Sequence, residues 1–381
     1  MRNHDVIIIG AGPVGSYTAY LLAQRGYDVG IFEKNPFVGK NINCTGIISQ
    51  KCLEKVKLNE TVIQRPIDSI KAFSPSGNFL KYHSSKPPAF IVDRVHFDRE
   101  INQMAVKAGA TIYLDAKVKE FRVSEEDFII GVLWENKDVE FRSRIGVIAT
   151  GFELNFIQRI FHNYAEFSFG IQTQASLDEI NDVEVYFGRE IAPGSFGWVV
   201  PTVGKLAKIG LITRSNPSGY LKKFLEHSLI KDRINGYDNN LRCSPIPNSR
   251  IPKSYFERFI IVGEAAGQVK TTTGGGIYFG MVCSEIAVKT IEKAFAYSDF
   301  SESLLREYEI KWVKKIEPEL TAGRILRNLF SRLSDHQIEL IIDLARKDGV
   351  LPAISKSDFD WHKDLIIYIL RHLFARKIFK F

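Results

Sequence analysis

The chain is 381 residues long, 45% hydrophobic and 25% charged, which is the composition of a globular protein with room for two or three domains. Its formal net charge of +7 is spread along the sequence, so we interpret it as a solvated basic surface and expect no nucleic-acid partner. The four cysteines form no CxxC pair, which excludes a zinc site and a small disulfide framework, so we expect no metal.

The first 35 residues predict a strand–helix–strand unit. The apolar, β-branched segment 5–9 is typical of a buried strand, and the amphipathic stretch after it ends near Gly26. A second strand, "DVGIFE", ends in Glu33. Between the first strand and the helix lies a G-x-G-x-x-G fingerprint formed by Gly10, Gly12 and Gly15. In this setting the fingerprint predicts a dinucleotide site.

Each part of the fingerprint has a physical role. Gly10 permits the tight turn, Gly12 lets the backbone approach a pyrophosphate at the helix N-terminus, and Gly15 allows close helix packing. Glu33 can accept hydrogen bonds from ribose hydroxyls, which argues against the 2′-phosphate of NADP. We therefore assign six residues of this unit to cofactor binding: Gly10, Gly12, Val14, Gly15, Glu33 and Lys34.

A second glycine-containing segment favours FAD over NAD. "FIIVGEAAG", residues 259–267, predicts a buried strand followed by Gly263 and an acid. Flavoproteins with an N-terminal fingerprint commonly complete their site with such a segment. We expect Glu264 to face the ribityl chain of FAD.

The middle of the chain interrupts and then resumes the nucleotide-binding unit. The segment 93–121 predicts a helix closed by Gly109 and then a strand, and the segment 121–151 alternates like a β-meander that ends in a buried strand. Small residues follow that strand, and we expect Thr150 and Gly151 to lie against the cofactor.

The remaining segments predict a sheet, a glycine-rich loop and helices. Residues 165–213 are rich in aromatic and β-branched residues and predict an antiparallel sheet, whereas the chain turns helical from about residue 296. "TTTGGG", residues 271–276, lies between a buried strand and a helix. We interpret its glycines as bare backbone for a flavin ring, and its threonines either line the pocket or shape the turn. The basic, amphipathic tail 364–381 predicts a helix packed on the body or, alternatively, one lying on a membrane surface.

Together these elements predict an α/β protein in which a Rossmann-like FAD-binding domain is interleaved with an antiparallel β-sheet substrate domain, followed by a C-terminal helical region. The predicted boundaries are 1–65, 91–164 and 251–295 for the FAD-binding domain, 66–90 and 165–250 for the substrate domain, and 296–381 for the helical region.

Three segments resemble the geranylgeranyl reductase family, FAD enzymes with the p-hydroxybenzoate hydroxylase-type fold. They are the N-terminal fingerprint, "GWVVP" around Trp198, and "VGEAAGQVKTTTGGGIYFGM". The family's cysteine loop looks like "NINCTGIIS", and its Arg-x-x-Phe-Asp segment begins here at Arg94. The resemblance covers roughly residues 1–290. Glu264, where relatives carry Asp, and "ATG" at 149–151 depart from the family pattern.

The resemblance implies an archaeal-type enzyme that reduces double bonds of geranylgeranyl chains in membrane lipid precursors. Hydride from reduced flavin goes to one alkene carbon and an acid protonates the other; Cys44 is the candidate acid, its alternative being a buried packing residue. Further cofactor-binding residues implied by the family positions are Cys44, Thr45, Ile47, Arg94, Val118, Gly275, Gly276 and Ile277. The implied substrate-binding residues are Phe196, Trp198 and Pro201.

Several alternatives stay open at this point. A flavin-dependent monooxygenase or halogenase acting on an apolar or aromatic substrate shares the fingerprint, and an electron-relay flavoprotein is a third interpretation. The electron donor is NAD(P)H or a ferredoxin-type protein. Lys40 and Lys270 flank the predicted cleft, where they attract a phosphate or a nicotinamide donor or are ordinary solvated lysines. With no signal peptide and no run of about 18 apolar residues, we expect a cytoplasmic protein that contacts at most the inner face of the membrane.

Overall fold

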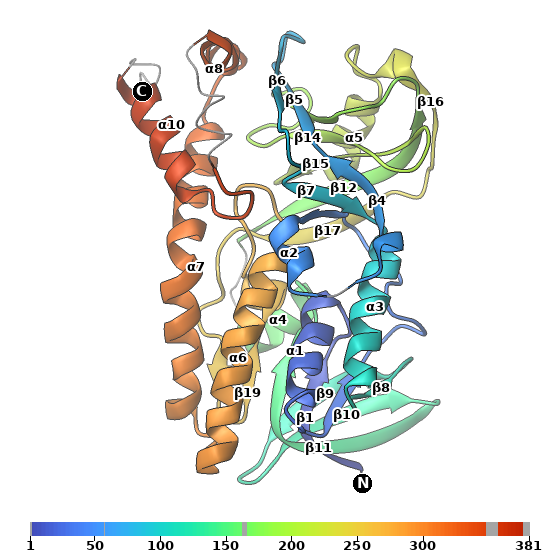
Figure 1. The fold of residues 1–381 in the computed structure, drawn as a ribbon, viewed down its shortest axis with the longest axis vertical. Helices are drawn as coiled ribbons and strands as arrows, with labels where there is room; N and C mark the ends of the chain where they lie inside the picture. Colours follow the sequence, from blue (N-terminus) through green and yellow to red (C-terminus); the bar gives the residue numbers. More distant parts are fainter. Residues whose placement is uncertain (1, 57, 162–165, 348–356, 376–381) are drawn as a thin grey trace.

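The computed structural model describes residues 2–56, 58–161, 166–347 and 357–375. The described residues form two eight-stranded sheets and one three-stranded sheet. In Figure 1 the sheet that contains β1 lies below the sheet that contains β12, and the long helices α6 and α7 run beside the lower sheet. The predicted α/β class is confirmed.

The first sheet is the expected parallel nucleotide-binding sheet, and a β-meander extends it. Its strands, in spatial order, are β18 (Tyr255–Phe256), β19 (Phe259–Ile261), β11 (Lys137–Ile148), β1 (Arg2–Ile9), β2 (Val29–Phe32) and β8 (Thr111–Tyr113). The pairs between β19 and β8 are parallel, while β10 (Phe128–Trp134) pairs antiparallel with β11 and with β9 (Lys117–Val123).

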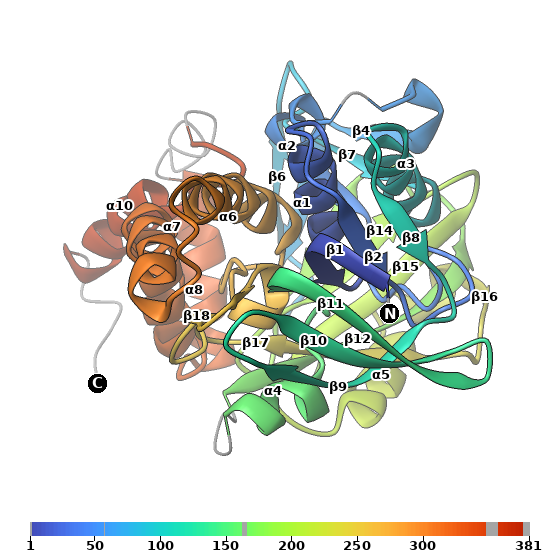
Figure 2. The ribbon, with the colours of Figure 1, turned by 90° about the horizontal axis from the view of Figure 1, so that it is seen from below.

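Both faces of this sheet are buried, because successive side chains of β1 point into two different apolar layers. Val6 and Ile8 join a core formed with helices α1 (Pro13–Ala23), α6 (Ile277–Tyr297) and α7 (Glu302–Phe330). Ile7 and Ile9 face the meander and helix α4 (Leu154–Ile160). Figure 2 shows α1 and α6 on one side of β1 and the meander strands on the other. A strand with two buried faces has a continuous apolar sequence, as "VIII" does.

The helix boundaries follow local chemistry. Helix α3 (Arg94–Lys107) begins after Asp93, whose side chain accepts hydrogen bonds from two backbone N–H groups of the first turn. The chain turns away at Gly109, where φ is +112°, and after α1 it turns at Gly26, where φ is +85°. Both glycines stand where the sequence predicts helix ends.

The second sheet is antiparallel except for one pair. Its strands, in spatial order, are β16 (Ile234–Tyr237), β12 (Phe167–Leu177), β15 (Leu206–Thr213), β14 (Gly197–Pro201), β13 (Val183–Tyr186), β5 (Ser69–Phe73) and β6 (Phe79–His83), and β17 (Arg242–Pro247) also pairs with β12. Helix α5 (Pro217–Leu225) covers its rear face through Leu221 and Phe224. The opposite face is turned towards the nucleotide-binding sheet.

The third, three-stranded sheet lies between the two larger ones. It contains β3 (Ile47–Ser49), β7 (Ala89–Val92) and β4 (Ile63–Ile67), and helix α2 (Gln50–Glu54) follows β3. One face packs on α1 and α6, and the other packs on β13 and β14 of the antiparallel sheet. Its strands come from both sides of the domain boundary predicted near residue 65. The predicted domain division stays a prediction.

The C-terminal part is helical, as expected. Helix α7 packs along α6 and buries Tyr308 and Trp312, and helices α8 (Asp335–Lys347) and α10 (Lys363–Ala375) follow. Helix α10 lies beside α7 and buries Ile366, so this part of the tail packs on the body. Residues 376–381, the last part of the predicted basic tail, lie outside the described residues. Across the described ranges, no helix has the length and hydropathy needed to cross a membrane.

Candidate active site

The fingerprint glycines fall into two groups. A methyl group on Gly10 would lie 2.5 Å from the Ala149 carbonyl oxygen, and one on Gly15 would lie 2.1 Å from the Gly10 carbonyl oxygen. A methyl group on Gly12 would meet nothing within 4 Å. Packing therefore requires glycine at positions 10 and 15, whereas Gly12 faces open space. Because no side chain caps helix α1 at Gly12, its N-terminus suits an anion.

Glu33 is oriented by the fingerprint itself. The backbone N–H of Ala11 donates to one carboxylate oxygen (3.0 Å), and the backbone N–H of Asn35 donates to the other (2.9 Å). The Glu33 side chain stands at the end of β2, where it joins the fingerprint turn to the following loop. A carboxylate oxygen can accept more than one hydrogen bond, so a ribose hydroxyl can be added to this arrangement.

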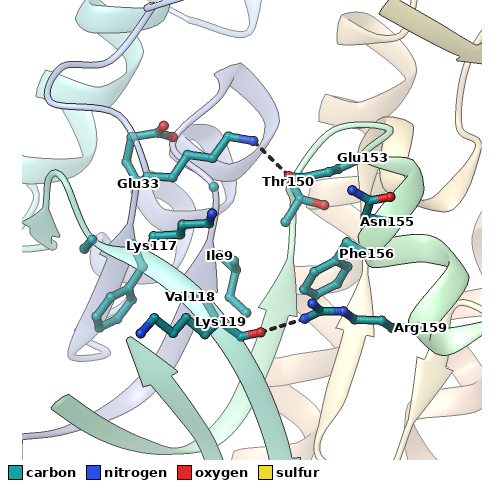
Figure 3. Close-up of a pocket in the computed structure, with 14 residues that line it drawn as sticks. Ile9, Glu33, Lys117, Val118, Lys119, Thr150, Glu153, Asn155, Phe156 and Arg159 are labelled. Carbon is teal, nitrogen blue, oxygen red and sulfur yellow. Dashed lines mark hydrogen bonds and ion pairs between the residues drawn. The ribbon is translucent and has the colours of Figure 1, made fainter. Parts of the chain in front are cut away.

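A cavity of about 420 Å³ opens beside these residues. It is lined by residues that the sequence assigns to the cofactor, including Gly10, Glu33, Lys34, Val118 and Thr150. Figure 3 shows Glu33 after β2, Val118 at the start of β9 and Thr150 in the turn after β11. A cavity lined by Gly10 of the fingerprint turn and by the oriented Glu33 carboxylate fits the adenosine part of FAD.

One side of this cavity has no signature in the sequence. Helix α4 and the turn before it contribute Glu153, Phe156 and Arg159. Lys34 forms an ion pair with Glu153 (2.9 Å), and Arg159 donates to the Lys119 carbonyl oxygen (2.7 Å). The sequence provides no periodic or spacing signal that marks these residues as pocket residues.

The second predicted segment, after β19, meets the fingerprint helix. Gly263 adopts φ of +69°, and a methyl group there would lie 3.1 Å from the Val14 side chain. Val14 also fills the space above Gly280 of α6, where a methyl group would lie 2.4 Å from it. Val14 is thus a packing contact between α1, α6 and this turn, and a direct contact of Val14 with the cofactor stays a prediction.

Glu264 lies between two glycines assigned to the cofactor. Its carboxylate oxygens are 3.2 Å from the position of a methyl group on Gly276 and 3.9 Å from that of one on Gly151. Burial raises the pKa of Glu264, and the nearby Arg94 guanidinium opposes that shift. The longer acid reaches both segments, so the change from Asp to Glu is compatible with a contact to the ribityl chain.

We call residues 270–276 the glycine loop. The Lys270 N–H donates to the Gly275 carbonyl oxygen (3.0 Å), and the Gly274 N–H donates to the Lys270 carbonyl oxygen (2.8 Å). The loop is therefore a closed turn and no linker. Helix α6 starts directly after it at Ile277, and its N-cap Gly276 provides no side-chain cap. The helix start expected at Gly275, Gly276 and Ile277 is therefore present, and its contact with the flavin stays a prediction.

Three side chains of the glycine loop have partners in the C-terminal part of the chain. Lys270 forms an ion pair with Asp360 (2.9 Å) and its side chain is 10% exposed, so the expectation of an ordinary solvated lysine is wrong. A contact of Lys270 with a ligand stays a prediction. Thr271 donates to the Leu320 carbonyl oxygen, and Thr272 is hydrogen-bonded to His362. These threonines join the loop to the C-terminal helices, an outcome that the sequence did not suggest. Lys40 is exposed, as expected of a solvated lysine.

Cys44 lies in a loop, residues 42–46, that crosses from the three-stranded sheet to the antiparallel sheet. The Lys208 ammonium group donates to the Cys44 carbonyl oxygen (2.9 Å) and to the Thr45 carbonyl oxygen (3.1 Å). The Asn43 amide donates to the Gly170 carbonyl oxygen (2.9 Å). Strands β12 and β15 thereby fix the loop backbone. The local sequence "LAKIGL" contains no motif that identifies Lys208 as a site residue.

Two cations interact with the Cys44 thiol, Arg94 and Lys208. Arg94 is held by Asp98 through two hydrogen bonds (3.0 and 3.1 Å), as the Arg-x-x-Phe-Asp segment suggests. Burial lowers the pKa of Lys208, and the nearby thiol opposes that shift. Cys44 is half-buried, and its sulfur accepts a hydrogen bond from the Gly46 N–H (3.4 Å). These polar surroundings differ from an apolar packing position.

The other three cysteines are unlike Cys44. Burial raises the pKa of Cys52 to about 12 and raises that of Cys283, and both pack in apolar clusters as predicted. Cys243 is exposed. Within the described ranges, no three His, Cys, Asp or Glu side chains gather in a way that would hold a metal ion.

Trp198 lies flat across the face of the antiparallel sheet. A methyl group on its cross-strand neighbour Gly210 would lie 2.5 Å from the indole ring, so glycine is required beneath it. Trp198 packs against an apolar cluster with Val200 and Ile47, and its ring centre is 6.1 Å from that of Phe196. Pro201 is buried at the end of β14. Trp198 thus borders the same junction as the Cys44 loop.

Comparison with known proteins agrees with this geometry. Residues 5–65 match the family model described as FAD dependent oxidoreductase. The digeranylgeranylglycerophospholipid reductase of Methanocaldococcus jannaschii is 28% identical over 89% of this chain and 90% of its own length. Digeranylgeranylglycerophospholipid reductase 1 of Methanococcoides burtonii is 27% identical over 98% of this chain and 93% of its own length. The predicted resemblance is confirmed. It extends well beyond residue 290, where we expected it to end.

Solved structures show the same fold. A geranylgeranyl bacteriochlorophyll reductase-like protein from Thermoplasma acidophilum superposes with a TM-score of 0.88 at 22% identity and covers 98% of this chain and 99% of its own. The p-nitrophenol 4-monooxygenase of Pseudomonas putida DLL-E4 has a TM-score of 0.73 at 17% identity and covers 95% and 99%. The fold is that of FAD-dependent oxidoreductases, and FAD is confirmed as the predicted cofactor.

Proposed function

We propose that this protein is an FAD-dependent reductase that saturates carbon–carbon double bonds of geranylgeranyl chains in a membrane lipid precursor. The observation that carries the proposal is similarity along nearly the whole chain to digeranylgeranylglycerophospholipid reductases. The electron-relay alternative has no comparable support. The likeness to monooxygenases and halogenases is one of fold alone.

Bound FAD, once reduced by the electron donor, would supply the hydride, and the chain itself would supply a proton and an apolar binding surface. We propose Cys44 as the proton donor to the second alkene carbon. After giving up its proton the sulfur carries a negative charge, and Arg94 and Lys208 offset that charge. The backbone bonds from Lys208 hold the loop while the thiol acts.

The substrate surface is proposed at Trp198 and its neighbours. Trp198, Val200 and Ile47 form an apolar wall beside the Cys44 loop, and a prenyl chain offers only apolar surface to bind. The N-terminus of α6 after the glycine loop provides N–H groups for negative charge on the reduced cofactor. Phe196 and Pro201 extend this proposed surface along β14.

The proposal extends to partners and location at a coarser level. A reductase of this kind needs an external electron donor, which we propose to be NAD(P)H or a ferredoxin-type protein. A lipid precursor with prenyl chains resides in a membrane, so we propose that the cytoplasmic protein meets its substrate at the inner membrane face. Ile367 of α10 is an exposed apolar residue, which suits such a contact.

The decisive test asks whether a lipid alkene or oxygen reoxidises the reduced flavin. The FAD-loaded protein is reduced with dithionite without oxygen and then mixed with an unsaturated geranylgeranyl glycerolipid. We expect the flavin to be reoxidised and the lipid to gain two hydrogen atoms for each double bond reduced. If only oxygen with an aromatic substrate reoxidises the flavin, and a hydroxylated or halogenated product forms, the proposal fails.

A further inference from the structure

A short segment before helix α10 reaches into the proposed cofactor site. We call residues 357–363 the C-terminal strap. In Figure 1 this red segment leaves α10 and passes close to the start of α6, beside α2. Lys51 of α2 forms an ion pair with Asp358, and the Trp361 ring lies 5.3 Å from the ring of Phe279 in the first turn of α6. The strap therefore touches the elements that surround the glycine loop.

The closest link is a buried ion pair. The Lys270 ammonium group lies 2.9 Å from Asp360, and the two side chains are 10% and 2% exposed. The same ammonium group lies 5.0 Å from the centre of the Phe359 ring. One carboxylate oxygen of Asp360 is buried and has no hydrogen-bond partner among the described residues. Asp360 is therefore committed to Lys270, since a buried carboxylate is stable only when it is paired.

The Lys270 side chain also packs against the glycine loop. A methyl group on Gly275 would lie 3.2 Å from the Lys270 side chain, so the lysine runs along the backbone of Gly275 on its way to Asp360. On the other side, a methyl group on Gly276 would lie 3.0 Å from Glu264. The two glycines are held between the Lys270 and Glu264 side chains.

A second link joins the strap to Thr272. The His362 imidazole contacts the Phe359 carbonyl oxygen through Nε2 (2.7 Å) and Thr272 through Nδ1 (3.0 Å). A carbonyl oxygen only accepts, so Nε2 carries the hydrogen and Nδ1 accepts from the Thr272 hydroxyl. Burial and the charge of Lys270 lower the pKa of His362, which favours this neutral form. Glu319 of α7 accepts from the backbone N–H groups of 362 and 363 and anchors the strap.

We propose that the C-terminal strap belongs to the active site: Asp360, acting through Lys270, is a positioning residue that sets the backbone of the glycine loop for binding FAD. The inference rests on the proposed function only in that the loop faces the flavin. Phe359 strengthens the connection, because it packs against the cluster that contains Trp198 and Ile47. One segment thus reaches both the proposed flavin site and the proposed substrate wall.

The test compares two ion pairs of the same strap. Asp360→Asn and Lys270→Met each break the buried pair, whereas Lys51→Met breaks the more exposed pair with Asp358. We expect Asp360→Asn and Lys270→Met to weaken FAD binding about tenfold and to shift the reduction potential of bound FAD, and the double variant to be no worse than the worse single variant. Lys51→Met keeps FAD affinity within about twofold.

Two further measurements separate positioning from general stability. Thr272→Val removes only the hydroxyl that meets His362, and we expect it to shift the flavin absorption spectrum at unchanged thermal stability of the apo-protein. Lys270→Arg keeps the charge and should restore much of the affinity. If all pair-breaking variants bind FAD with the wild-type affinity, spectrum and potential, the strap is only a structural anchor and the proposal is overturned. These measurements need no lipid, so they stand apart from the test of reductase activity.

Discussion

The two ends of the proposed FAD site are built in different ways. At the fingerprint end, the glycines and the acid are near one another in the chain, and Glu33 accepts a hydrogen bond from Ala11, 22 residues earlier. At the reactive end, Lys208 meets Cys44 across 164 residues, and Lys270 meets Asp360 across 90. A local motif specifies the first end, whereas the tertiary fold alone assembles the second.

The sharpest test of this comparison replaces two glycines of the fingerprint. Gly15→Ala places a methyl group 2.1 Å from a carbonyl oxygen, so we expect a loss of about 3 kcal/mol in the unfolding free energy of the apo-protein together with loss of FAD binding. A methyl group on Gly12 meets no protein atom within 4 Å, so we expect Gly12→Ala to leave apo-protein stability unchanged. We expect it to weaken FAD binding about a hundredfold, since the methyl group would intrude on the proposed pyrophosphate position.

Urea unfolding of the apo-proteins and FAD titration measure the two effects separately. Equal destabilisation by both substitutions would contradict the division between packing and ligand-facing glycines.

The next effect concerns the thiol. Cys44→Ser should bind FAD normally and lower the rate of lipid-dependent flavin reoxidation about a hundredfold, because a serine hydroxyl is a much poorer proton donor. Cys243→Ser, on an exposed cysteine, is the matched control and should keep the wild-type rate. Stopped-flow absorbance under anaerobic conditions gives the rates. A wild-type rate in Cys44→Ser would remove the thiol from the mechanism.

Lys208 extends the comparison to a residue without any local signature. Lys208→Met removes both hydrogen bonds to the Cys44 loop and one positive charge, so we expect reoxidation about tenfold slower with FAD affinity retained. Lys205→Met alters an exposed lysine paired with exposed Asp178 just before the same strand, and it should change neither property. An unchanged rate in Lys208→Met would show that the β-sheet holds the loop without this lysine.

The smallest expected effect is on pH dependence. Burial raises the pKa of Glu264, against the opposing charge of Arg94, so the folded apo-protein holds this proton at pH values where the unfolded chain has lost it. The unfolding free energy contributed by Glu264 therefore falls as pH rises from the ordinary carboxyl pKa through the raised one. Glu264→Gln should remove this fall. Urea unfolding of wild type and variant over that pH range would show two parallel profiles if Glu264 did not contribute.

The sequence predicted what depends on local geometry. Gly10, Gly15 and Glu33 carry a fixed spacing that a tight strand–helix turn demands, and the helix-ending glycines were equally readable. Lys208 and Asp360 were missed because their chemistry arises only when distant segments meet. The ion pair of Lys270 was missed for the same reason. Its place beside a glycine-rich loop suggested ligand binding, because its partner Asp360 lies 90 residues further along the chain.

The three-stranded sheet has a mechanical consequence. Val92 on one face packs with Tyr17 and Met281 of the nucleotide-binding part, and Ile91 on the other packs with Val200 of the antiparallel sheet. A hinge rotation between the two large sheets would separate one of these packed faces from its neighbour and expose apolar surface to water. We infer that the two parts move as one body, so the prenyl chain of the proposed substrate would have to enter at the rim of the junction without a domain closure around it.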